Sequence, residues 1–503
     1  MANQYFIGID GGTESIRAGI FDSAGTPIAF AATAYETAFP RPGWAEQNPA
    51  HWWSALGRSV RKAVSDAGLS PDEIAAVCVD TTCCSVVALD GQGNALRPAL
   101  IWMDVRAAAE ADRVAGSGDP ALRLNSDGKG PVSAEWMIPK ALWLKENEPE
   151  TFTRAETICE YQDYINFHLT GRRVASINNA AVRWHYLARQ GGYQPGLLAK
   201  LGLEALEEKW PREIIELGDV IGGLTAGAAA HLGLPEGLPV AQGGADAFIA
   251  MIGLGVVKPG KMAFITGSSH LHLGLSDRAF HAQGIWGTYA DALLPGFHVV
   301  EGGQTSTGSM VAWFRRLLGE DVGFDVLNAE AARLPPGSNG LIVQDHFQGN
   351  RTPHTDPLSR GAISGLTLSH DRGHLFRAML EGVAYGSKLI LETQRAAGYR
   401  PDELMIAGGV TNSELWMQIH ADVSGMPLTV THVADAAALG SAILAATASG
   451  AFSSITEASN AMVHVERRIE PDMAAHEAYR PSYEAYRRAY EANKSITKPL
   501  TSL

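Results

Sequence analysis

Two segments of the chain share one pattern of apolar and polar positions: an apolar strand, a short turn rich in glycine and hydroxyl residues, and a second apolar strand. The first is residues 5–22, with the sequence YFIGIDGGTESIRAGIFD, and the second is residues 261–275, with the sequence KMAFITGSSHLHLGL. Apolar runs bounded by Gly and Ser clusters predict β-hairpins. Because the hairpins lie half a chain apart and each opens its own domain, the sequence indicates a duplicated unit.

Strands alternate with helical stretches in the first half. We predict a helix over residues 49–67 that begins near Asn48, and a buried strand over residues 74–80. Alternation of this kind predicts a mainly parallel sheet covered by helices. Residues 105–215 are mostly helical by periodicity and are interpreted as an insertion beside a central cleft, with these apolar anchors: Trp136, Leu142, Trp143, Leu144 and Phe152.

The second half repeats the plan after a Pro- and Gly-rich stretch, residues 233–244, which we interpret as an interdomain hinge. The domains are therefore expected at 1–241 and 242–503. A final amphipathic helix, roughly 474–493, precedes a short polar tail that we expect to lack regular structure. The other predicted elements are strands near 298–300 and 404–407 and helices over 307–319, 371–398, 412–424 and 435–450.

Composition describes an ordinary globular protein with more than one core. A chain of 503 residues exceeds what a single core supports. The net charge of −14 argues against a nucleic-acid partner, which needs a basic face. The four cysteines show no C-x-x-C spacing, the amino terminus has no signal-peptide pattern, and every long apolar run falls short of a membrane span. We expect a cytoplasmic protein with reduced thiols.

The first turn has the chemistry of a phosphate-binding loop. Gly11 and Gly12 permit the positive φ of a tight turn and let a phosphate approach backbone N–H groups closely. Thr13 adds a hydroxyl, Arg17 adds a cation, and Asp10 is placed to hold Mg²⁺. The alternatives are a simple turn aspartate for Asp10 and a surface side chain for Arg17.

A longer motif carries a family resemblance. Residues 361–381, GAISGLTLSHDRGHLFRAMLE, match the carboxy-terminal signature of the FGGY carbohydrate kinases at each defined position. The amino-terminal signature is poorer, since residues 140–144 keep its lysine and tryptophan but the sequence departs upstream. Other motifs fall in the family's order, namely residues 8–22, 243–246, 266–269, 408–409 and 438–440. By this resemblance the chain is identified as a member of that family.

The resemblance implies a fold class and a set of ligands. The fold is α/β, with two actin-like ATPase (ribonuclease H-like) domains around a central cleft, and the ligands are ATP, Mg²⁺ and an open-chain sugar. Family members are commonly homodimers. A non-catalytic, regulatory ATPase of the same superfamily is the alternative of another class.

Asp246 is implied to be the general base that accepts the proton of the attacking sugar hydroxyl, and a ligand of the metal and the sugar as well. A carboxylate within hydrogen-bond reach of the alcohol meets this chemical need. Small residues precede Asp246 and an apolar helix follows it, so a helix-capping role is the alternative.

The resemblance also implies a nucleotide site in the second domain. Its predicted β- and γ-phosphate contacts are Thr266, Gly267 and Ser268, and its predicted adenosine contacts are Gly308, Ala312, Gly408, Gly409 and Asn412. For Gly308, close helix packing is an open alternative.

The sugar site looks like that of ribulokinases and related pentulose kinases. The segments that carry this likeness are residues 82–85, 132–147, 182–184, 267–270 and 301–304. They imply sugar contacts from Cys83 and Cys84, hydroxyl recognition by Arg183 and Glu301, and closure of the pocket by Trp102 and Asp104. For Trp102 a position in the core is the alternative. Arg183 stands where ribulokinases tend to have lysine, and its wider planar fork can alter the acceptor geometry. Pentitol, tetrose and other ketose substrates therefore stay open.

Two residue clusters each have a structural and a functional interpretation. Cys83 and Cys84 form either a redox pair or a pocket wall, and we favour the wall because vicinal cysteines seldom form a relaxed disulfide. His270, His272 and His281 form either a metal site or structural positions, and we favour structural positions because no carboxylates accompany them.

Overall fold

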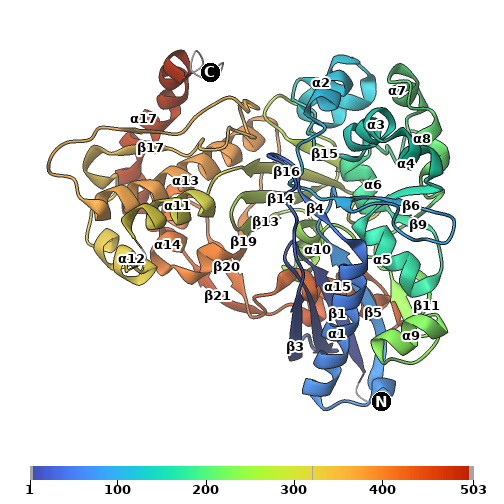
Figure 1. Ribbon diagram of the computed structural model, residues 1–503. Coiled ribbons are helices and arrows are strands. Elements are labelled where there is room, and N and C mark those ends of the chain that lie inside the picture. The colour runs from blue at the N-terminus through green and yellow to red at the C-terminus, as the bar shows by residue number, and fades with distance from the viewer. Residues whose placement is uncertain (1–3, 320, 498–503) are drawn as a thin grey trace.

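The computed structural model describes residues 4–319 and 321–497 and shows two lobes, each built around one sheet (Figure 1). The strand order in the first lobe is β11 (Val220–Gly223), β12 (Pro239–Ala241), β5 (Ile74–Thr81), β1 (Tyr5–Gly11), β2 (Ser15–Asp22) and β3 (Pro27–Ala34). The order in the second lobe is β21 (Val465–Ile469), β20 (Leu428–Thr431), β19 (Glu403–Gly408), β13 (Lys261–Thr266), β14 (His270–Ser276), β16 (His298–Gln304) and β15 (Gly287–Ala290).

The second sheet repeats the six strands of the first and adds β15 at one edge. In each, a hairpin (β1–β2 or β13–β14) is followed on one side by an antiparallel strand, and on the other by two parallel strands and an antiparallel edge strand. The duplicated unit predicted from the hairpins is confirmed. The prediction of a mainly parallel sheet is wrong, because three of the five neighbouring pairs in the first sheet are antiparallel. Short turns join β1, β2 and β3, and such turns permit only antiparallel pairing.

Helices cover both sheets, and many of their bounds follow local signals. Helix α1 spans Pro49–Ala67, as predicted, with the Asn48 side chain accepting the Ala50 N–H at its start. The other helices of the first half are α2 (Ala108–Gly116), α3 (Met137–Asn147), α4 (Pro149–Arg154), α5 (Tyr161–Thr170), α6 (Ile177–Arg183), α7 (Pro195–Lys200), α8 (Ala205–Lys209) and α9 (Ala226–Leu232). Those of the second half are α10 (Asp246–Gly253), α11 (Gly308–Leu318), α12 (Phe324–Ala332), α13 (Arg372–Ala396), α14 (Glu414–Ser424), α15 (Ala436–Ala448), α16 (Ile455–Met462) and α17 (Met473–Thr497).

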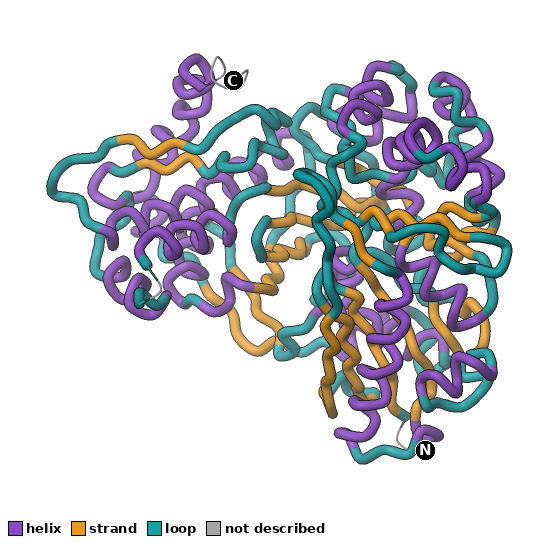
Figure 2. Tube along the Cα trace, viewed as in Figure 1, coloured by secondary structure: helices purple, strands orange, loops and turns teal. Residues whose placement is uncertain are grey.

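The helical insertion is real but also contains strands. Figure 2 shows its helices gathered above the first sheet. Its five predicted apolar anchors are all buried. Within it, β9 (Val174–Ser176) pairs with β10 (Glu213–Ile215), and β8 (Thr157–Glu160) joins a small sheet with β6 (Val86–Leu89), β7 (Ala99–Leu100) and β4 (Glu46–Gln47). The remaining pair of strands is β17 (Ile342–Gln344) and β18 (Ala362–Ser364).

Two segments at predicted boundaries differ in part from expectation. The predicted hinge, residues 233–244, contains β12, which pairs in parallel with β5 inside the first sheet. Of the predicted polar tail, residues up to Thr497 continue helix α17, and residues 498–503 lie outside the described residues. No helix in the described part of the chain combines the length and apolar character needed to cross a membrane.

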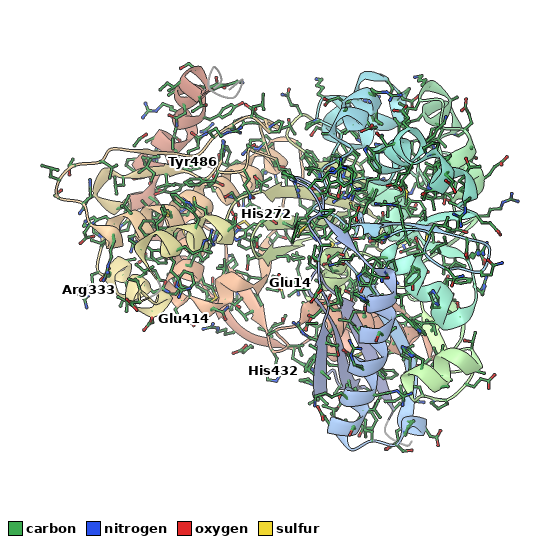
Figure 3. The ribbon with its side chains drawn as sticks, viewed as in Figure 1. Glu14, His272, Arg333, Glu414, His432 and Tyr486 are labelled. Carbon is green, nitrogen blue, oxygen red and sulfur yellow. The ribbon has the colours of Figure 1, made fainter. Side chains whose placement is uncertain are left out.

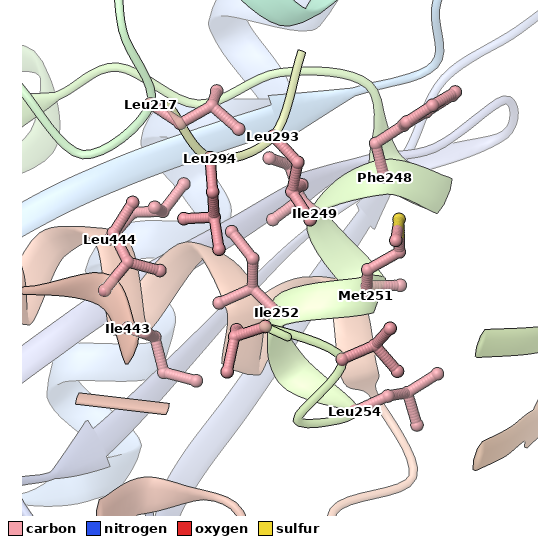
Figure 4. Close-up of a cluster of buried hydrophobic side chains, with 14 of the residues drawn as sticks. Leu217, Phe248, Ile249, Met251, Ile252, Leu254, Leu293, Leu294, Ile443 and Leu444 are labelled. Carbon is pink, nitrogen blue, oxygen red and sulfur yellow. The ribbon is translucent and has the colours of Figure 1, made fainter. Parts of the chain in front are cut away.

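Helix α15 belongs to the second half of the sequence but packs on the first sheet (Figure 1). A Cβ on Gly8 of β1 would lie 1.8 Å from the Ala438 carbonyl oxygen, and one on Gly440 would lie 2.2 Å from the Ile249 carbonyl oxygen. Glycine at these positions lets β1, α15 and α10 approach closely. The apolar side chains of α10 and α15 meet in one core (Figure 4). The two halves of the chain are therefore joined by a shared hydrophobic core.

Three histidines are buried against one face of the second sheet, where they pack around Phe264. They are His270, His272 and His420, and at least one ring nitrogen of each lacks a hydrogen-bond partner among the described residues. Burial lowers the pKa of His272 and of His420 to about 3. His272 lies on β14 in the centre of the molecule (Figure 3). The rings are therefore neutral at physiological pH.

This burial predicts acid sensitivity. A histidine whose pKa falls from 6.5 to about 3 on folding stabilises the protein above pH 6.5, and that contribution is lost as the pH falls. Each pH unit below 6.5 should cost about 1.4 kcal/mol per such ring. We expect His272→Leu to flatten the fall in Tm between pH 7 and pH 5, whereas replacement of the exposed His51 should not. Equal slopes for wild type and the His272 variant would contradict the prediction.

Candidate active site

Three carboxylates gather where parallel strands of the first sheet end. Asp10 and Asp80 are paired in register near the ends of β1 and β5. Beyond the end of β12, Thr81 forms a parallel bridge to Ala245, and Asp246 is the residue that follows this bridge. Carboxyl ends of parallel strands meet at one edge of a sheet, where open α/β folds bind ligands. The sheet thus brings together residues that are far apart in sequence.

The carboxylates influence one another electrostatically. Burial, together with the carboxylates of Asp246 and Asp435, raises the pKa of Asp10 to about 7. Burial and the Asp10 carboxylate raise the pKa of Asp80 well above its usual range. Burial also raises the pKa of Asp246 to about 6. Like charges in a buried group disfavour ionisation, so this edge favours a bound cation.

Asp80 and Asp435 escaped the sequence reasoning. Asp80 is fully buried, and its Oδ2 accepts the Ser441 hydroxyl at 2.6 Å while its Oδ1 has no partner in the described chain. Asp435 caps helix α15 and forms an ion pair with Arg17. An aspartate at the end of an apolar run was a local signal for Asp80. Asp435 gave no comparable signal, because its approach depends on the packing of α15.

The structure contradicts the conformational reason given for Gly11 and Gly12, and it places Arg17 in an ion pair. Neither Gly11 nor Gly12 has a positive φ, so the conformational argument for them is wrong. Gly11 instead makes close approach possible, since a Cβ there would lie 3.0 Å from Thr81 and 3.1 Å from the Tyr161 hydroxyl. The phosphate role of this turn stays a prediction. Arg17 is engaged by Asp435 and half-exposed.

Asp246 opens helix α10 and lines a cavity of about 220 Å³ between the lobes. Its Oδ1 accepts the Ala247 N–H at 2.6 Å, so the carboxylate also engages the start of its own helix. Thr13, Cys83, Cys84, Trp102 and Arg183 line the same cavity. The structure therefore brings the predicted base together with the predicted sugar contacts.

Arg183 reaches this cavity with Glu301 behind it. The guanidinium and carboxylate form two hydrogen bonds, Nη2 to Oε1 at 3.0 Å and Nη1 to Oε2 at 3.1 Å. The Tyr289 hydroxyl donates to Oε2 at 2.6 Å and accepts from Nη1 at 3.0 Å. Glu301 is fully buried and is not part of the cavity wall. In this conformation it orients Arg183, whereas the sequence predicted a direct sugar contact.

Buried polar groups hold the backbone of Cys84, which lines one side of the cavity together with Cys83. The Cys84 N–H donates to Glu160 at 2.8 Å, and the Lys140 ammonium donates to the carbonyl oxygens of Cys84, Leu100 and Ile101 at 2.7, 3.1 and 2.7 Å. The sulfur atoms of Cys83 and Cys84 lie 3.7 Å apart as free thiols. The lysine of the amino-terminal signature therefore fixes the backbone that forms one side of the cavity.

Asp104 does not face the cavity, contrary to prediction. Its carboxylate is fully buried, forms an ion pair with Arg106 at 2.6 Å and accepts the Ala45 N–H at 2.6 Å. These bonds both involve Oδ2, and Oδ1 accepts the Arg106 backbone N–H and Nε at 3.1 and 2.9 Å, so both oxygens are occupied inside the lobe. Its neighbour Trp102 does line the cavity, with its indole N–H donating to the Thr13 hydroxyl at 2.9 Å.

A second cavity, of about 370 Å³, lies in the second lobe. Six of the eight residues predicted for the nucleotide line it, namely Gly267, Ser268, Gly308, Ala312, Gly409 and Asn412. Apolar walls come from Phe324, Phe376, Leu380 and Trp416. A flat apolar slot next to glycine-rich turns suits a purine and its phosphates. Gly308 also packs closely, because a Cβ there would lie 2.4 Å from the Gly267 carbonyl oxygen.

Thr266 and Gly408 lie beneath this cavity and are not among its lining residues. The Thr266 hydroxyl donates to the Ala407 carbonyl at 2.7 Å and accepts the Val410 N–H at 3.1 Å. Gly408 has a φ of 94°, and a Cβ there would lie 1.8 Å from the Thr266 carbonyl oxygen. Both residues therefore shape the 408–412 loop, and a phosphate contact by the Thr266 hydroxyl disagrees with these bonds.

This geometry predicts a contrast between Gly408 and a glycine outside the cavity. Gly408→Ala should raise the KM for ATP at least about tenfold and lower Tm, because the strained φ and the clash displace the loop. Gly409 lines the nucleotide cavity, so the control is Gly227→Ala on α9, whose Cβ would meet no described atom within 4 Å and which lies outside the cavity. Steady-state kinetics and thermal melts check both. Similar values for the two variants would contradict the assignment of Gly408.

Arg351 and Glu135 also line the first cavity and were not singled out from the sequence. The Arg351 guanidinium lies over the Trp286 ring, 5.0 Å from its centroid. Both residues come from irregular segments, where neither spacing nor periodicity signals a functional side chain.

Two family models match consecutive parts of the chain. A model of the FGGY family of carbohydrate kinases, N-terminal domain, matches residues 5–253, and one of the C-terminal domain matches residues 262–449. The chain belongs to the FGGY family of carbohydrate kinases. This FGGY kinase is 31% identical to an FGGY carbohydrate kinase domain-containing protein of Xenopus laevis, with 95% of both chains covered. It is 32% identical to a ribulokinase of Shouchella clausii (strain KSM-K16), covering 92% of this chain and 91% of that protein.

Solved structures agree on the architecture. The FGGY kinase superposes on a xylulose kinase from Rhodospirillum rubrum with a TM-score of 0.87 and 29% identity, covering 99% of this chain and 100% of the other. A Plasmodium falciparum glycerol kinase with ADP gives a TM-score of 0.85 at 18% identity, covering 97% and 98%, which supports the fold alone. The predicted two-domain α/β kinase fold is confirmed. The protein is an ATP-dependent carbohydrate kinase.

Proposed function

We propose that this kinase transfers the γ-phosphoryl group of MgATP to a primary hydroxyl of an open-chain pentulose of the D- or L-ribulose type. The observation that carries the proposal is the cavity wall shared by Asp246, Arg183 and the Cys83–Cys84 turn. The ribulokinase relatives at about 31–32% identity support the sugar class. Pentitols, tetroses and other ketoses are the alternatives within the family.

Asp246 acts as the base in this proposal. A sugar hydroxyl in the cavity would lie against the carboxylate, which orients the oxygen and accepts its proton during attack. A pKa near 6 leaves the carboxylate ionised at neutral pH and raises its basicity above that of an exposed aspartate. The bond to the Ala247 N–H fixes one oxygen and leaves the other for the substrate. Ala245 is the N-cap of α10, so Asp246 is the first residue of the helix and not its capping residue.

Mg²⁺ fits the edge where the three strands end. The Asp80 Oδ1 is buried without a partner, and Asp10 and Asp246 are hard oxygen donors whose mutual repulsion a cation would relieve. Within residues 4–319 and 321–497, no three His, Cys, Asp or Glu side chains converge to hold a metal by themselves. Mg²⁺ commonly uses one or two carboxylates plus phosphates and water. When bound, it neutralises charge on the transferring phosphoryl group.

Arg183 provides the sugar specificity in this proposal. Its guanidinium keeps a fixed orientation because Glu301 and Tyr289 hold it from behind. An open-chain polyol needs such fixed donors, because each buried hydroxyl left without a partner costs roughly 1–3 kcal/mol. Lobe closure would exclude water and restrain ATP hydrolysis.

A substrate panel tests the proposal directly. ADP release should be measured with the purified protein, MgATP and a set of pentuloses, pentitols, tetroses and glycerol. We expect the highest kcat/KM for a ribulose, with Asp246→Asn as the inactive control. A preference for another sugar would overturn the pentulose assignment. A flat panel would favour a non-catalytic, regulatory ATPase.

Quaternary structure and location remain proposals from the family resemblance. We propose a homodimer, which sedimentation of the purified protein tests, and a cytoplasmic location, which fractionation tests. A monomer across the micromolar range would contradict the first, and recovery in another fraction the second.

A further inference from the structure

A third cavity, of about 400 Å³, lies outside both cavities described above. Its walls come from the 3₁₀ helix Pro120–Leu124, from residues 186–190 of the insertion, and from β15, β16 and the loop before them. Its volume is within the range of small-ligand sites, roughly 300–1,000 Å³. It therefore has room for a metabolite, and neither catalysis nor nucleotide binding uses it.

The charged side chains that line this cavity are all basic. Arg123, Arg189, His281 and His298 contribute to the wall, and no Asp or Glu does. Nδ1 of His298 is buried and has no partner in the described chain. Burial lowers the pKa of His298, Arg189 and His281 lower it further, and Asp291 and Asp277 oppose them. Four basic side chains thus line the cavity.

The arginines keep binding capacity despite their ion pairs. Arg189 uses Nε and Nη2 to bind Asp291, both at 2.7 Å, which leaves Nη1 for a ligand. Arg123 contacts Asp127 through Nε at 3.1 Å, and its side chain is largely exposed. These acidic partners orient the guanidinium groups without lining the cavity. An oriented guanidinium recognises phosphate well because its planar fork is fixed in advance.

Strand β15 separates this cavity from the sugar site. Thr288 and Ala290 line the cavity, whereas Tyr289 between them faces the other side and bonds Arg183 and Glu301. Alternate residues of a strand point to opposite faces. A ligand bound against Thr288 and Ala290 would therefore displace Tyr289 on the other face. A second connection is Asn125, which follows cavity residue Leu124 and donates to the Tyr289 hydroxyl at 3.2 Å. Strand β15 and Asn125 therefore both connect this cavity to Tyr289, which holds Arg183.

We propose that this cavity is a regulatory site for a small phosphorylated metabolite, which changes the affinity for the sugar through β15 and Tyr289. The phosphate would bind between Arg189, His281 and His298, and the remainder of the ligand would lie along Tyr186 and Gln190. Coupling between two ligand sites is typically about 5- to 150-fold in affinity. The inference does not depend on which sugar the kinase phosphorylates.

Direct binding is the first test, and it is independent of activity. Titration calorimetry would use sulfate, whose charge is constant between pH 6 and 8, with ADP saturating the nucleotide cavity. We expect wild type to bind sulfate and Arg189→Gln/His298→Asn to bind it at least about tenfold more weakly. Arg113→Gln is the control, because Arg113 also forms an exposed ion pair outside the cavity, its Nη1 donating to the two Glu146 carboxylate oxygens at 2.8 and 2.7 Å. Arg123→Gln, which alters an exposed side chain, replaces the double variant if that does not fold.

The pH dependence adds a second measurement. Sulfate affinity should be higher at pH 6 than at pH 8, because a bound anion favours the protonated form of His298, which faces Arg189, Asp291, His281 and Asp277. Burial lowers the pKa of this imidazole, so the gain in affinity is expected at the acidic end of the range. Absence of sulfate binding at 10 mM, or equal binding by the double variant, would overturn the site.

Coupling to the sugar is tested separately. The sugar KM should be measured with and without glycerol 3-phosphate, a small phosphate monoester, using the sugar that the substrate panel identifies. We expect the monoester to shift the sugar KM at least about fivefold in wild type and in Arg113→Gln, but not in the double variant. Sulfate binding without any shift in KM would overturn the regulatory role and leave only an anion site. Failure of the sugar assignment would change the substrate and leave the calorimetric result intact.

Discussion

Replacing Asp246 with asparagine is expected to lower kcat by at least about 100-fold while leaving sugar affinity nearly unchanged. The amide keeps the size of the side chain and its contact with the Ala247 N–H, but it cannot accept the hydroxyl proton. The substitution also removes one of the carboxylates that raise the pKa of Asp10. Steady-state kinetics give kcat, and sugar binding in the absence of ATP gives affinity.

The matched control for this variant is Asp371→Asn. Asp371 accepts the His374 N–H at the start of α13, so the variant makes the same carboxylate-to-amide change at a helix start away from the cavity. Its kcat should stay within about twofold of wild type, since asparagine caps helices as well as aspartate does. An Asp246 variant that keeps most of its turnover would remove Asp246 from the mechanism.

Replacing Glu301 with alanine should raise the sugar KM by at least about 100-fold with little effect on the KM for ATP. The change leaves Arg183 and Tyr289 without the carboxylate that holds both, and a buried charge without its partner is costly. Because Glu301 is not part of the cavity wall, the effect passes through the orientation of Arg183. Kinetics with each substrate varied in turn would separate the two KM values.

Glu381→Ala is the control for loss of a buried ion pair. Glu381 binds Arg377 at 2.8 Å in the second lobe and is as buried as Glu301. We expect a comparable loss in Tm without the rise in sugar KM. Equal weakening of sugar and ATP by the Glu301 variant would count against its assignment to the sugar site.

Local sequence patterns predicted much of the fold and several of the residues that line each cavity. The two hairpins, helix α1 with its Asn48 cap and the strand before Asp80 all follow from patterns within about 20 residues. Asp246 and the loop glycines Gly267 and Gly409 were assigned from short motifs, and they do line the two cavities. Local patterns serve here because turn geometry, capping and strand burial depend on neighbouring residues.

The role of a residue did not follow from the sequence where it depends on a contact partner that is distant in the chain. Asp104 was expected in the sugar pocket, but Arg106 and Ala45 hold it inside the lobe. Glu301 was expected beside Arg183 as a second sugar contact, but it lies behind it. In both cases the residue type and neighbourhood were informative. Which way the side chain points was decided by partners far away in the chain.

The sequence by itself determined the duplicated hairpin unit, because hairpins depend on local hydrogen bonding and periodicity, and its motifs gave the resemblance from which the family and most site residues were inferred. Only the tertiary structure decided that β5 pairs with β1, which places Asp80 beside Asp10, and that α15 packs on the first sheet, which brings Asp435 to the same group. The physical reason is that electrostatic and packing energies depend on distance in space, whereas residues 10, 80, 246 and 435 are far apart along the chain.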